Sequence, residues 1–190
     1  LLLRFPTFAQ RTALASQLTT GTTTRAEVAA GLVFNDEYRG LDVDRVFVRF
    51  LKRQPDPGGR TYWITGLGNG KTLRKFRAQL FGSNEYFSKA GSTTSGFVKA
   101  AYADVLGRLP DAAGLSYWVN KITAGTGRGS VANSFLSSTE ARRTIVKDQF
   151  LRFANRYPNQ AELDTWIPRL STNPTGEQEL IVFLASSGAY

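Results

Sequence analysis

The chain of 190 residues contains no cysteine and no histidine. It therefore cannot form disulfides, use a thiol nucleophile or build a zinc site from Cys and His ligands. Mechanisms that need an imidazole base are excluded as well. No apolar run approaches the roughly 20 residues that a membrane-spanning helix needs. We therefore expect no transmembrane segment and no cofactor. No metal site is assigned, and a calcium ion bound by loop carbonyls near Asp56 or Asp111 is left open.

The composition is that of a folded protein, with 42% hydrophobic and 21% charged residues. This balance is enough for a real core and is not typical of a disordered tail. The opening residues, LLLRFPTF, lack the basic region and long apolar core of a signal peptide, and no Met precedes them. We expect the chain to be a processed product or a fragment of a longer array.

The sequence repeats itself around three tryptophans. Trp63, Trp118 and Trp166 lie in similar segments, separated by offsets of 55 and 48 residues. The seven-residue difference falls after Glu85, where the sequence reads GSTTSG. Residues 13–40 resemble the second half of such a unit. The repeat predicts a partial helical unit at residues 1–40, followed by units at residues 41–93, 94–143 and 144–190, the last of them degenerate.

Each unit has the pattern of about three helices. Apolar residues recur on one helical face in the first helix of the second and third units. These residues are Val43, Val46, Phe47, Phe50 and Leu51, and then Phe97, Val98, Ala101, Tyr102 and Val105. A turn with proline ends this helix, and Asp56, Asp111 or Asn159 can cap the next one. A third, short helix carries Val131 and Phe135 one turn apart. The predicted fold is all-α, built from tandem packed helical units with a partial first unit.

The segment Arg108-Leu-Pro110-Asp111-Ala-Ala-Gly114-Leu-Ser-Tyr117-Trp118 repeats a motif also found at residues 53–63. The motif resembles the bacterial family known as domain of unknown function 4214, and the resemblance covers most of residues 41–143. It implies a helical module, often repeated, found mainly in secreted or surface-exposed bacterial proteins, and it implies no catalytic residues. The arrangement is also loosely similar to the linker domains of phycobilisomes.

The repeated polar and aromatic residues are interpreted as structural. Buried aromatic anchors and helix caps explain them better than a binding site does. We also expect a bidentate ion pair between Arg53 and Glu85, and another between Arg108 and Glu140. The set assigned to structure is Arg53, Asp56, Trp63, Glu85, Arg108, Asp111, Trp118, Glu140 and Trp166. Because each recurrent acid has such a role, the chain is predicted not to be an enzyme.

The repeat does not explain the net charge of +9. Residues 45–99 contain 11 basic and 2 acidic side chains, so the whole excess lies there. The third unit has uncharged or acidic residues at most of the corresponding positions, which suggests that the fold does not need these cations. The obvious aromatics are expected to be buried, so a base-stacking platform is not indicated. The predicted polyanion-binding residues are Arg45, Arg49, Lys52, Lys71, Arg74, Lys75 and Arg77.

These observations predict a non-catalytic structural or interaction module of a larger secreted or cell-surface bacterial protein. Its basic face would hold an acidic glycan, lipid head groups or an acidic partner subunit. Expected partners are thus an acidic surface polymer or neighbouring subunits, and self-association into a homo-oligomer is left open. A basic helical nucleic-acid-binding protein is the alternative. A solvated basic face without any ligand is the plainest interpretation of the charge.

Overall fold

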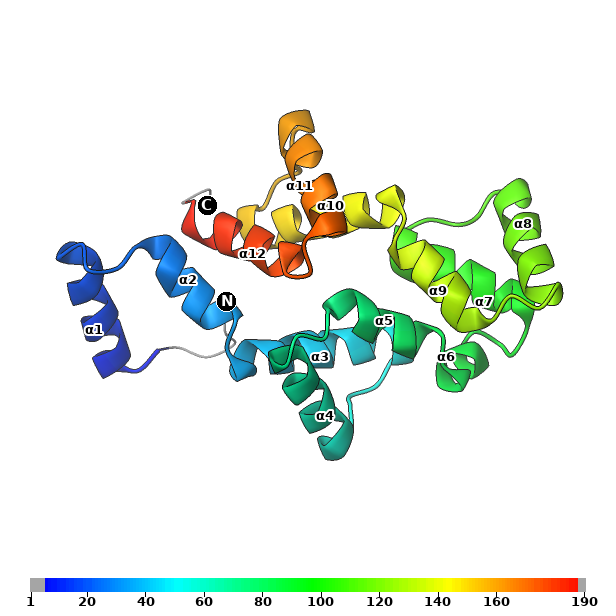
Figure 1. Ribbon diagram of the computed structural model, residues 1–190, viewed down its shortest axis with the longest axis horizontal. Helices are drawn as coiled ribbons and strands as arrows, with labels where there is room; N and C mark the ends of the chain where they lie inside the picture. The colour runs from blue at the N-terminus through cyan, green and yellow to red at the C-terminus, as the bar shows by residue number, and fades with distance from the viewer. Residues whose placement is uncertain (1–5, 188–190) are drawn as a thin grey trace. The chain divides into compact units, whose positions relative to one another are not determined.

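The computed structural model describes residues 6–187 (Figure 1). These residues form twelve α-helices and one π-helical turn and contain no strand, which confirms the all-α class. In chain order the elements are α1 (Phe8–Thr19), α2 (Arg25–Val33), α3 (Asp36–Leu51), α4 (Pro57–Gly68), α5 (Leu73–Phe81), α6 (Asn84–Lys89), α7 (Thr94–Ala101), η1 (Tyr102–Leu106), α8 (Ala112–Thr123), α9 (Arg128–Leu136), α10 (Thr139–Ala154), α11 (Gln160–Thr172) and α12 (Gly176–Ser186).

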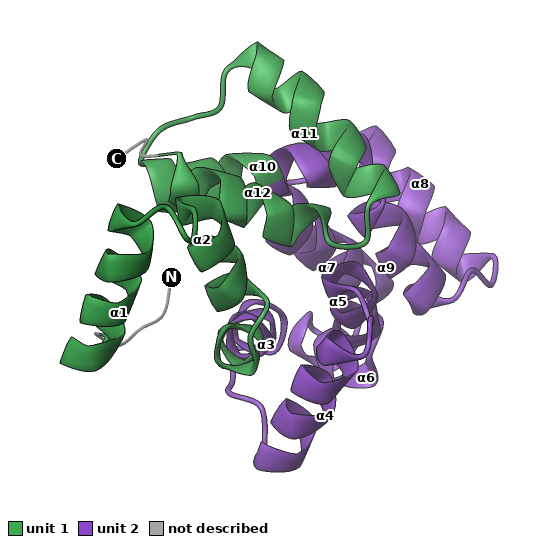
Figure 2. Ribbon diagram, turned by 60° about the vertical axis from the view of Figure 1, so that its left-hand side comes forward, with its two compact units in different colours: residues 1–41, 146–190 green, residues 42–145 purple. Residues whose placement is uncertain are grey.

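The helices form two compact units (Figure 2). Unit 1 comprises residues 1–41 and 146–190, and unit 2 comprises residues 42–145. Unit 2 therefore contains nearly all of the predicted second and third helical units, whereas unit 1 contains those at the two ends of the chain. The division into four repeat units stays a prediction. The first predicted unit begins, and the last one ends, outside the described residues, and so does the start of the LLLRFPTF segment.

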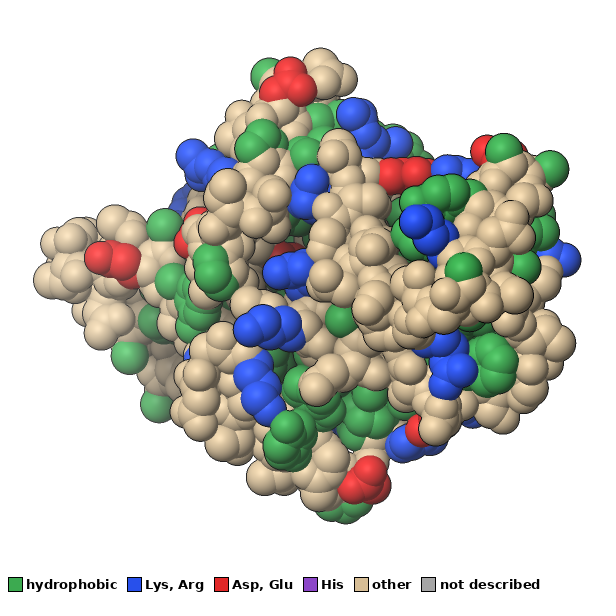
Figure 3. All heavy atoms as spheres, turned by 45° about the vertical axis from the view of Figure 1, so that its right-hand side comes forward, with side chains coloured by type: hydrophobic (Ala, Val, Ile, Leu, Met, Phe, Trp, Pro, Cys, Tyr) green, Lys and Arg blue, Asp and Glu red, His purple; other side chains and the backbone are tan. Residues whose placement is uncertain are grey.

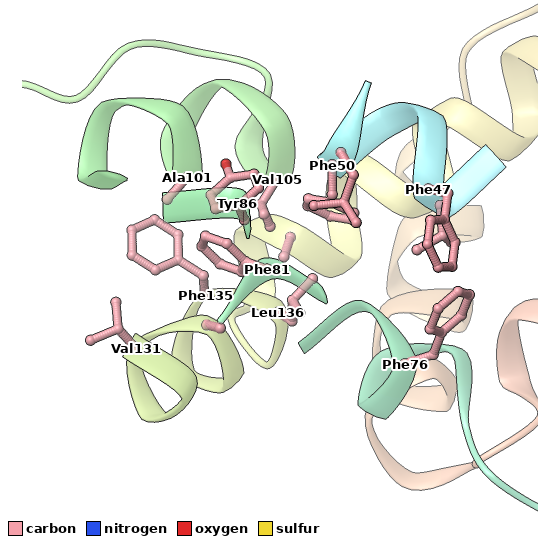
Figure 4. Packing of buried hydrophobic residues seen from close by; sticks show 14 of the residues in the cluster. Phe47, Phe50, Phe76, Phe81, Tyr86, Ala101, Val105, Val131, Phe135 and Leu136 are labelled. Carbon is pink, nitrogen blue, oxygen red and sulfur yellow. The ribbon is translucent and has the colours of Figure 1, made fainter. Parts of the chain in front are cut away.

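The core of unit 2 confirms the apolar faces expected from the sequence. All five predicted residues of α3 are buried, as are all five on α7 and η1. Aromatic rings join these helices to the third helices of the repeats. In Figure 4, Phe76 on α5 is directed towards Phe47 on α3, at 6.0 Å between ring centroids. Phe81 lies beside Tyr86, at 5.0 Å, and fills the space between α5 and α6.

The seven extra residues of the second unit divide a helix in two. In α10, residues that follow the Ser138 cap continue for 16 residues without a break. The corresponding cap, Ser83, instead starts the six-residue helix α6. Gly91 and Ser92 then adopt positive φ angles of 90° and 54°, and Thr93 caps α7. The insertion thus produces a turn where the other repeat has a continuous helix.

Within unit 2, α5 packs against α9, the third helix of the following repeat. Within unit 1, α2 packs against α12, which also contacts α11. The two pairings involve corresponding helices, because α2, α5, α9 and α12 are the third helices of the four predicted repeats. Unit 1 has one small core around Phe150 and Trp166 and another around Val33 and Tyr38. Among residues 6–187, no helix combines the length and the apolarity needed to cross a bilayer.

Candidate functional site

The repeated arginine and glutamate residues form the ion pairs expected from the sequence. Arg53 Nε donates to Glu85 Oε1 at 2.6 Å, and Arg53 Nη2 donates to Glu85 Oε2 at 2.8 Å. Arg108 holds Glu140 in the same two-bond geometry. Each arginine also donates to the carbonyl of the residue that follows it. The pair therefore fastens the proline turn to the end of its own repeat.

These ion pairs change the acidity of both carboxyl groups. A hydrogen bond from Arg53 lowers the pKa of Glu85 below its ordinary value, and burial opposes the shift only in part. The hydrogen bond from Arg108 lowers the pKa of Glu140 in the same way. A general acid needs a raised pKa, so neither group is prepared for proton donation.

The two aspartates of the motif are helix caps, as predicted. Asp56 Oδ1 accepts a hydrogen bond from Gly59 N at 2.8 Å, and Asp111 Oδ1 accepts one from Gly114 N at 2.6 Å. The backbone bond from Gly59 lowers the pKa of Asp56. A Cβ on Gly114 would stand 2.4 Å from Tyr102 Oη, so glycine here makes room for a core side chain.

In the first and fourth repeats, a capping box begins the helix that follows this turn. Asn159 and Glu162 form a capping box, as predicted, and Arg156 pairs with the same Glu162 at 2.6 Å. Thr7 and Gln10 form an equivalent box at the start of α1. The sequence analysis missed this cap because it aligned the first unit only from residue 13. The letters Arg4-Phe5-Pro6-Thr7 nevertheless repeat the Arg-x-Pro motif, 104 residues before Arg108.

The three tryptophans differ in burial. Trp63 and Trp166 are buried, and each indole packs on a ring of its own repeat's third helix. Trp118 packs on Phe135 with a centroid distance of 4.9 Å but is only half-buried. All three are therefore packing residues, and the contact of Trp118 is the least complete.

The predicted polyanion-binding residues on α3, and Lys52 directly after it, contact groups of their own unit. Arg45 forms an ion pair with Asp42 at 2.9 Å. Arg49 Nε donates to the backbone carbonyl of Asp104 at 2.7 Å, and Lys52 Nζ lies 3.2 Å from Asp104 Oδ1. Arg49 and Lys52 therefore make contacts with η1 within the fold, and the inference that the fold does not need these cations stays a prediction.

Asp104 is the centre of this contact. Its Oδ2 accepts a hydrogen bond from the hydroxyl of Tyr86 at 2.9 Å. Burial, and secondly the Asp104 charge, raise the pKa of the Tyr86 hydroxyl far above its ordinary value. No sequence signal indicates this role, because Asp104 stands at the repeat position of Arg49 and differs from it only as an acid in place of a cation.

The predicted residues on and before α5 contact uncharged groups or remain exposed. Arg74 Nη1 donates to Asn133 Oδ1 at 3.0 Å and to Ser137 Oγ at 2.9 Å. Lys71 Nζ donates to Tyr62 Oη at 2.6 Å. Lys75 is exposed and Arg77 is half-buried. On the face drawn in Figure 3, basic side chains stand singly or in small groups among uncharged ones. Binding of a polyanion by this set stays a prediction.

The expectation that the obvious aromatics are buried is wrong for the motif tyrosines. Tyr62 is 55% exposed and Tyr117 is 54% exposed. Neither the repeat nor the apolar periodicity distinguishes them from the tryptophans that follow. The signal that could have indicated exposure is their position, since in each helix the adjacent tryptophan already occupies the inward face.

The described helices define an all-α protein in which the ion-paired turn at Arg53 is found again at Arg108. Residues 77–145 match the family model described as domain of unknown function (DUF4214). This match confirms the family resemblance for a segment that begins within α5 and includes Arg108, Trp118 and Glu140. Comparisons with curated proteins and with solved structures gave no match.

Proposed function

We propose that the chain is a non-catalytic interaction module of a secreted or cell-surface bacterial protein. In this proposal the basic surface of residues 42–145 binds an acidic polymer, with an acidic glycan as the preferred class. The cell-surface setting rests on the family resemblance. The non-catalytic role is supported by the motif acids, which serve as caps and ion-pair partners.

The charge of unit 2 carries the proposal. Residues 42–145 contain 16 basic and 7 acidic side chains, a net charge of +9, whereas the two segments of unit 1 together have a net charge of zero. Every acid of unit 2 is engaged within that unit. The ion pairs are Asp42 with Arg45, Asp44 with Arg60, Glu85 with Arg53, Asp104 with Lys52 and Glu140 with Arg108, and the caps are Asp56 and Asp111.

No acid of unit 2 is therefore left over to balance the remaining cations. Lys75 and Lys99 are exposed and have no ion-pair partner among the described residues. A surplus of positive charge of this kind attracts anions. Binding of a polyanion releases counterions, which favours the complex, and the affinity therefore falls as the salt concentration rises. A polymer with regularly spaced carboxylates suits such a surface.

The test is binding of the full chain to polygalacturonate, double-stranded DNA, anionic vesicles and uncharged dextran over a series of salt concentrations. We expect binding to polygalacturonate that weakens as salt rises, and no binding to dextran. Tight DNA binding without polygalacturonate binding would favour the nucleic-acid alternative. Failure to bind any polyanion would contradict the proposal.

A charge-reversed variant and a matched control locate the surface. Lys75→Glu with Lys99→Glu should weaken polygalacturonate binding without loss of helical structure, because neither lysine forms an ion pair in the fold. Arg25→Glu with Lys147→Glu makes the same change of net charge at exposed positions of unit 1. Equal weakening by both variants would show that net charge alone matters and that unit 2 holds no binding surface.

A further inference from the structure

Each motif tyrosine contacts the tryptophan that follows it, although the tyrosine is exposed. The ring of Tyr62 meets Trp63 edge-on, with a centroid distance of 5.2 Å and an interplanar angle of 80°. Tyr117 meets Trp118 in the same way, at 5.1 Å and 83°. Both tyrosines lie on the second helix of their repeat, in α4 and α8. The repeat therefore presents the same half-exposed ring twice within unit 2.

A lysine ammonium accompanies each of these rings. Lys121 stands four residues after Tyr117 on α8, and its Nζ lies 5.6 Å from the ring centroid. Lys71 comes from the loop after α4, and its Nζ lies 4.0 Å from the centroid of Tyr62. The two lysines do not occupy corresponding positions, since the position of Lys121 in the second unit is Gly66.

Gly66 explains how the loop lysine reaches the ring. A Cβ at this position would stand 2.8 Å from Lys71 Cδ and 3.4 Å from its Nζ. The absence of a side chain at residue 66 thus leaves the path along α4 that Lys71 follows. The sequence repeat does not explain why both rings have an ammonium group beside them, because Lys71 and Lys121 stand at different positions of the repeat. The fourth unit shows the contrast, where Thr165 replaces the tyrosine and Arg169 lies over the indole of Trp166.

We propose that Tyr62 with Lys71, and Tyr117 with Lys121, are two subsites for the hexuronate residues of an acidic polysaccharide. A pyranose ring has an apolar face of C–H bonds that can stack on the π-face of a tyrosine. Its carboxylate can pair with the neighbouring ammonium. The inference rests on the proposed function and names the ligand class and residues of that surface.

The spacing of the two groups favours a sugar acid over a nucleotide. In a hexuronate the carboxylate is bonded directly to the ring, so stacking and ion pairing act within one small unit. The ammonium groups lie 4.0 and 5.6 Å from the ring centroids, which matches this compact arrangement. In a nucleotide, a whole ribose separates the stacked base from the phosphate.

The test compares polygalacturonate with polyphosphate, a polyanion that has no sugar ring, as probes for the full chain. In the variant Tyr62→Thr with Tyr117→Thr, each tyrosine is replaced by the residue found in the fourth repeat. We expect this variant to bind polygalacturonate about tenfold more weakly, which corresponds to the combined loss of two weak stacking contacts, and to bind polyphosphate as the wild type does. Circular dichroism and thermal unfolding check that the helices remain.

Two further variants separate the ring from the charge. Tyr62→Phe with Tyr117→Phe keeps the aromatic face and should retain most of the polygalacturonate binding, although it removes the Tyr62 hydroxyl that accepts a hydrogen bond from Lys71. Lys71→Gln with Lys121→Gln should weaken that binding more than Lys75→Gln with Lys99→Gln, which removes the same charge elsewhere in unit 2.

The outcomes distinguish the subsites from the proposed function. If the threonine variant binds polygalacturonate as tightly as the wild type, the subsites are wrong and the polyanion surface stands. Equal losses for polygalacturonate and polyphosphate would also overturn the subsites, since the tyrosines would then act through the fold. If the wild-type chain binds neither probe, the proposed function itself fails.

Discussion

Gly82 at the end of α5 lies directly against Gly129 near the start of α9. A Cβ on Gly82 would stand 2.9 Å from Gly129 Cα and 3.2 Å from Gly129 N. The offset of 55 residues makes Gly82 the counterpart of Ser137, and Gly129 the counterpart of Arg74. Arg74 and Ser137 are themselves in contact, at 2.9 Å. The contact between Gly82 and Gly129 therefore has a counterpart between Ser137 and Arg74. Such reciprocal contacts across the antiparallel pair α5 and α9 are those of an internal two-fold relationship.

Substitutions of these two glycines should have opposite effects. Gly82→Ala forces its methyl group into the backbone of α9, and we expect it to lower the free energy of unfolding by about 1–3 kcal/mol. A Cβ at residue 129 would have no atom within 4 Å. Gly129→Ala should therefore raise the free energy of unfolding by about 0.5 kcal/mol, because alanine lowers the conformational entropy of the unfolded chain. Urea denaturation of both variants measures this. Equal effects would contradict the close approach of the helices.

The ion pairs of the turn make stability depend on pH. The pKa values of Glu85 and Glu140 lie below 4.5, their ordinary value, in the folded protein. Their contribution is therefore present above pH 4.5, where both states have charged carboxylates, and is lost as the pH falls through the lowered folded-state pKa values. The side chains are more than a third exposed, so the expected total is only about 1 kcal/mol.

Urea denaturation between pH 7 and pH 3 checks this dependence. Glu85→Gln with Glu140→Gln removes both titrating groups and should give a shallower loss of stability than the wild type. The remaining slope belongs to other acids with lowered pKa, including Asp56 and Glu162. An unchanged slope would mean that the arginine pairs do not form in solution.

Local signals predicted most of the fold. Caps such as Asp56, Asp111 and Asn159 act within one helical turn, and the apolar face of α3 is fixed by helical periodicity. The Arg53–Glu85 pair was also predicted, although it spans 32 residues, because the same two residues recur together in the next repeat.

Contacts between repeats could not be predicted in this way. Arg49 and Asp104 occupy corresponding positions, so an alignment treats them as alternatives, whereas the structure places them in contact. At Lys52 and Asp104, the charge difference between the repeats is thus an ion pair across their interface. Lys71 was counted as a surface cation, because its position over Tyr62 depends on a path along α4 that only the three-dimensional structure contains.

The burial of the tryptophans predicts graded effects on stability. Trp63→Ala removes a buried indole packed 4.1 Å from the Phe76 ring, and we expect a loss of about 3–5 kcal/mol. The interpretation of Trp118 as a buried aromatic anchor would give the same loss for Trp118→Ala. Because Trp118 is half-buried, we now expect about 2 kcal/mol. Urea denaturation compares the two, and an equal or larger loss for Trp118 would contradict this order.

Asp104 and Tyr86 should be energetically coupled. Asp104→Ala leaves the buried hydroxyl of Tyr86 without its acceptor and removes the partner of Lys52, so we expect a loss of about 2 kcal/mol. Tyr86→Phe removes the hydroxyl alone and should cost about 1 kcal/mol. The double variant no longer contains an unsatisfied buried hydroxyl. Its loss should therefore be smaller than the sum of the single losses by about 1 kcal/mol.

Chemical denaturation of the wild type, both single variants and the double variant provides this coupling energy. Asp104→Asn serves as the control, because its amide oxygen can still accept from Tyr86 while the charge facing Lys52 is gone. Losses that simply add would show that Tyr86 and Asp104 stabilise unit 2 independently. If Tyr86→Phe costs as much stability in the Asp104→Asn background as in the wild type, the coupling comes from the hydrogen bond. The charge of Asp104 would then matter only for Lys52.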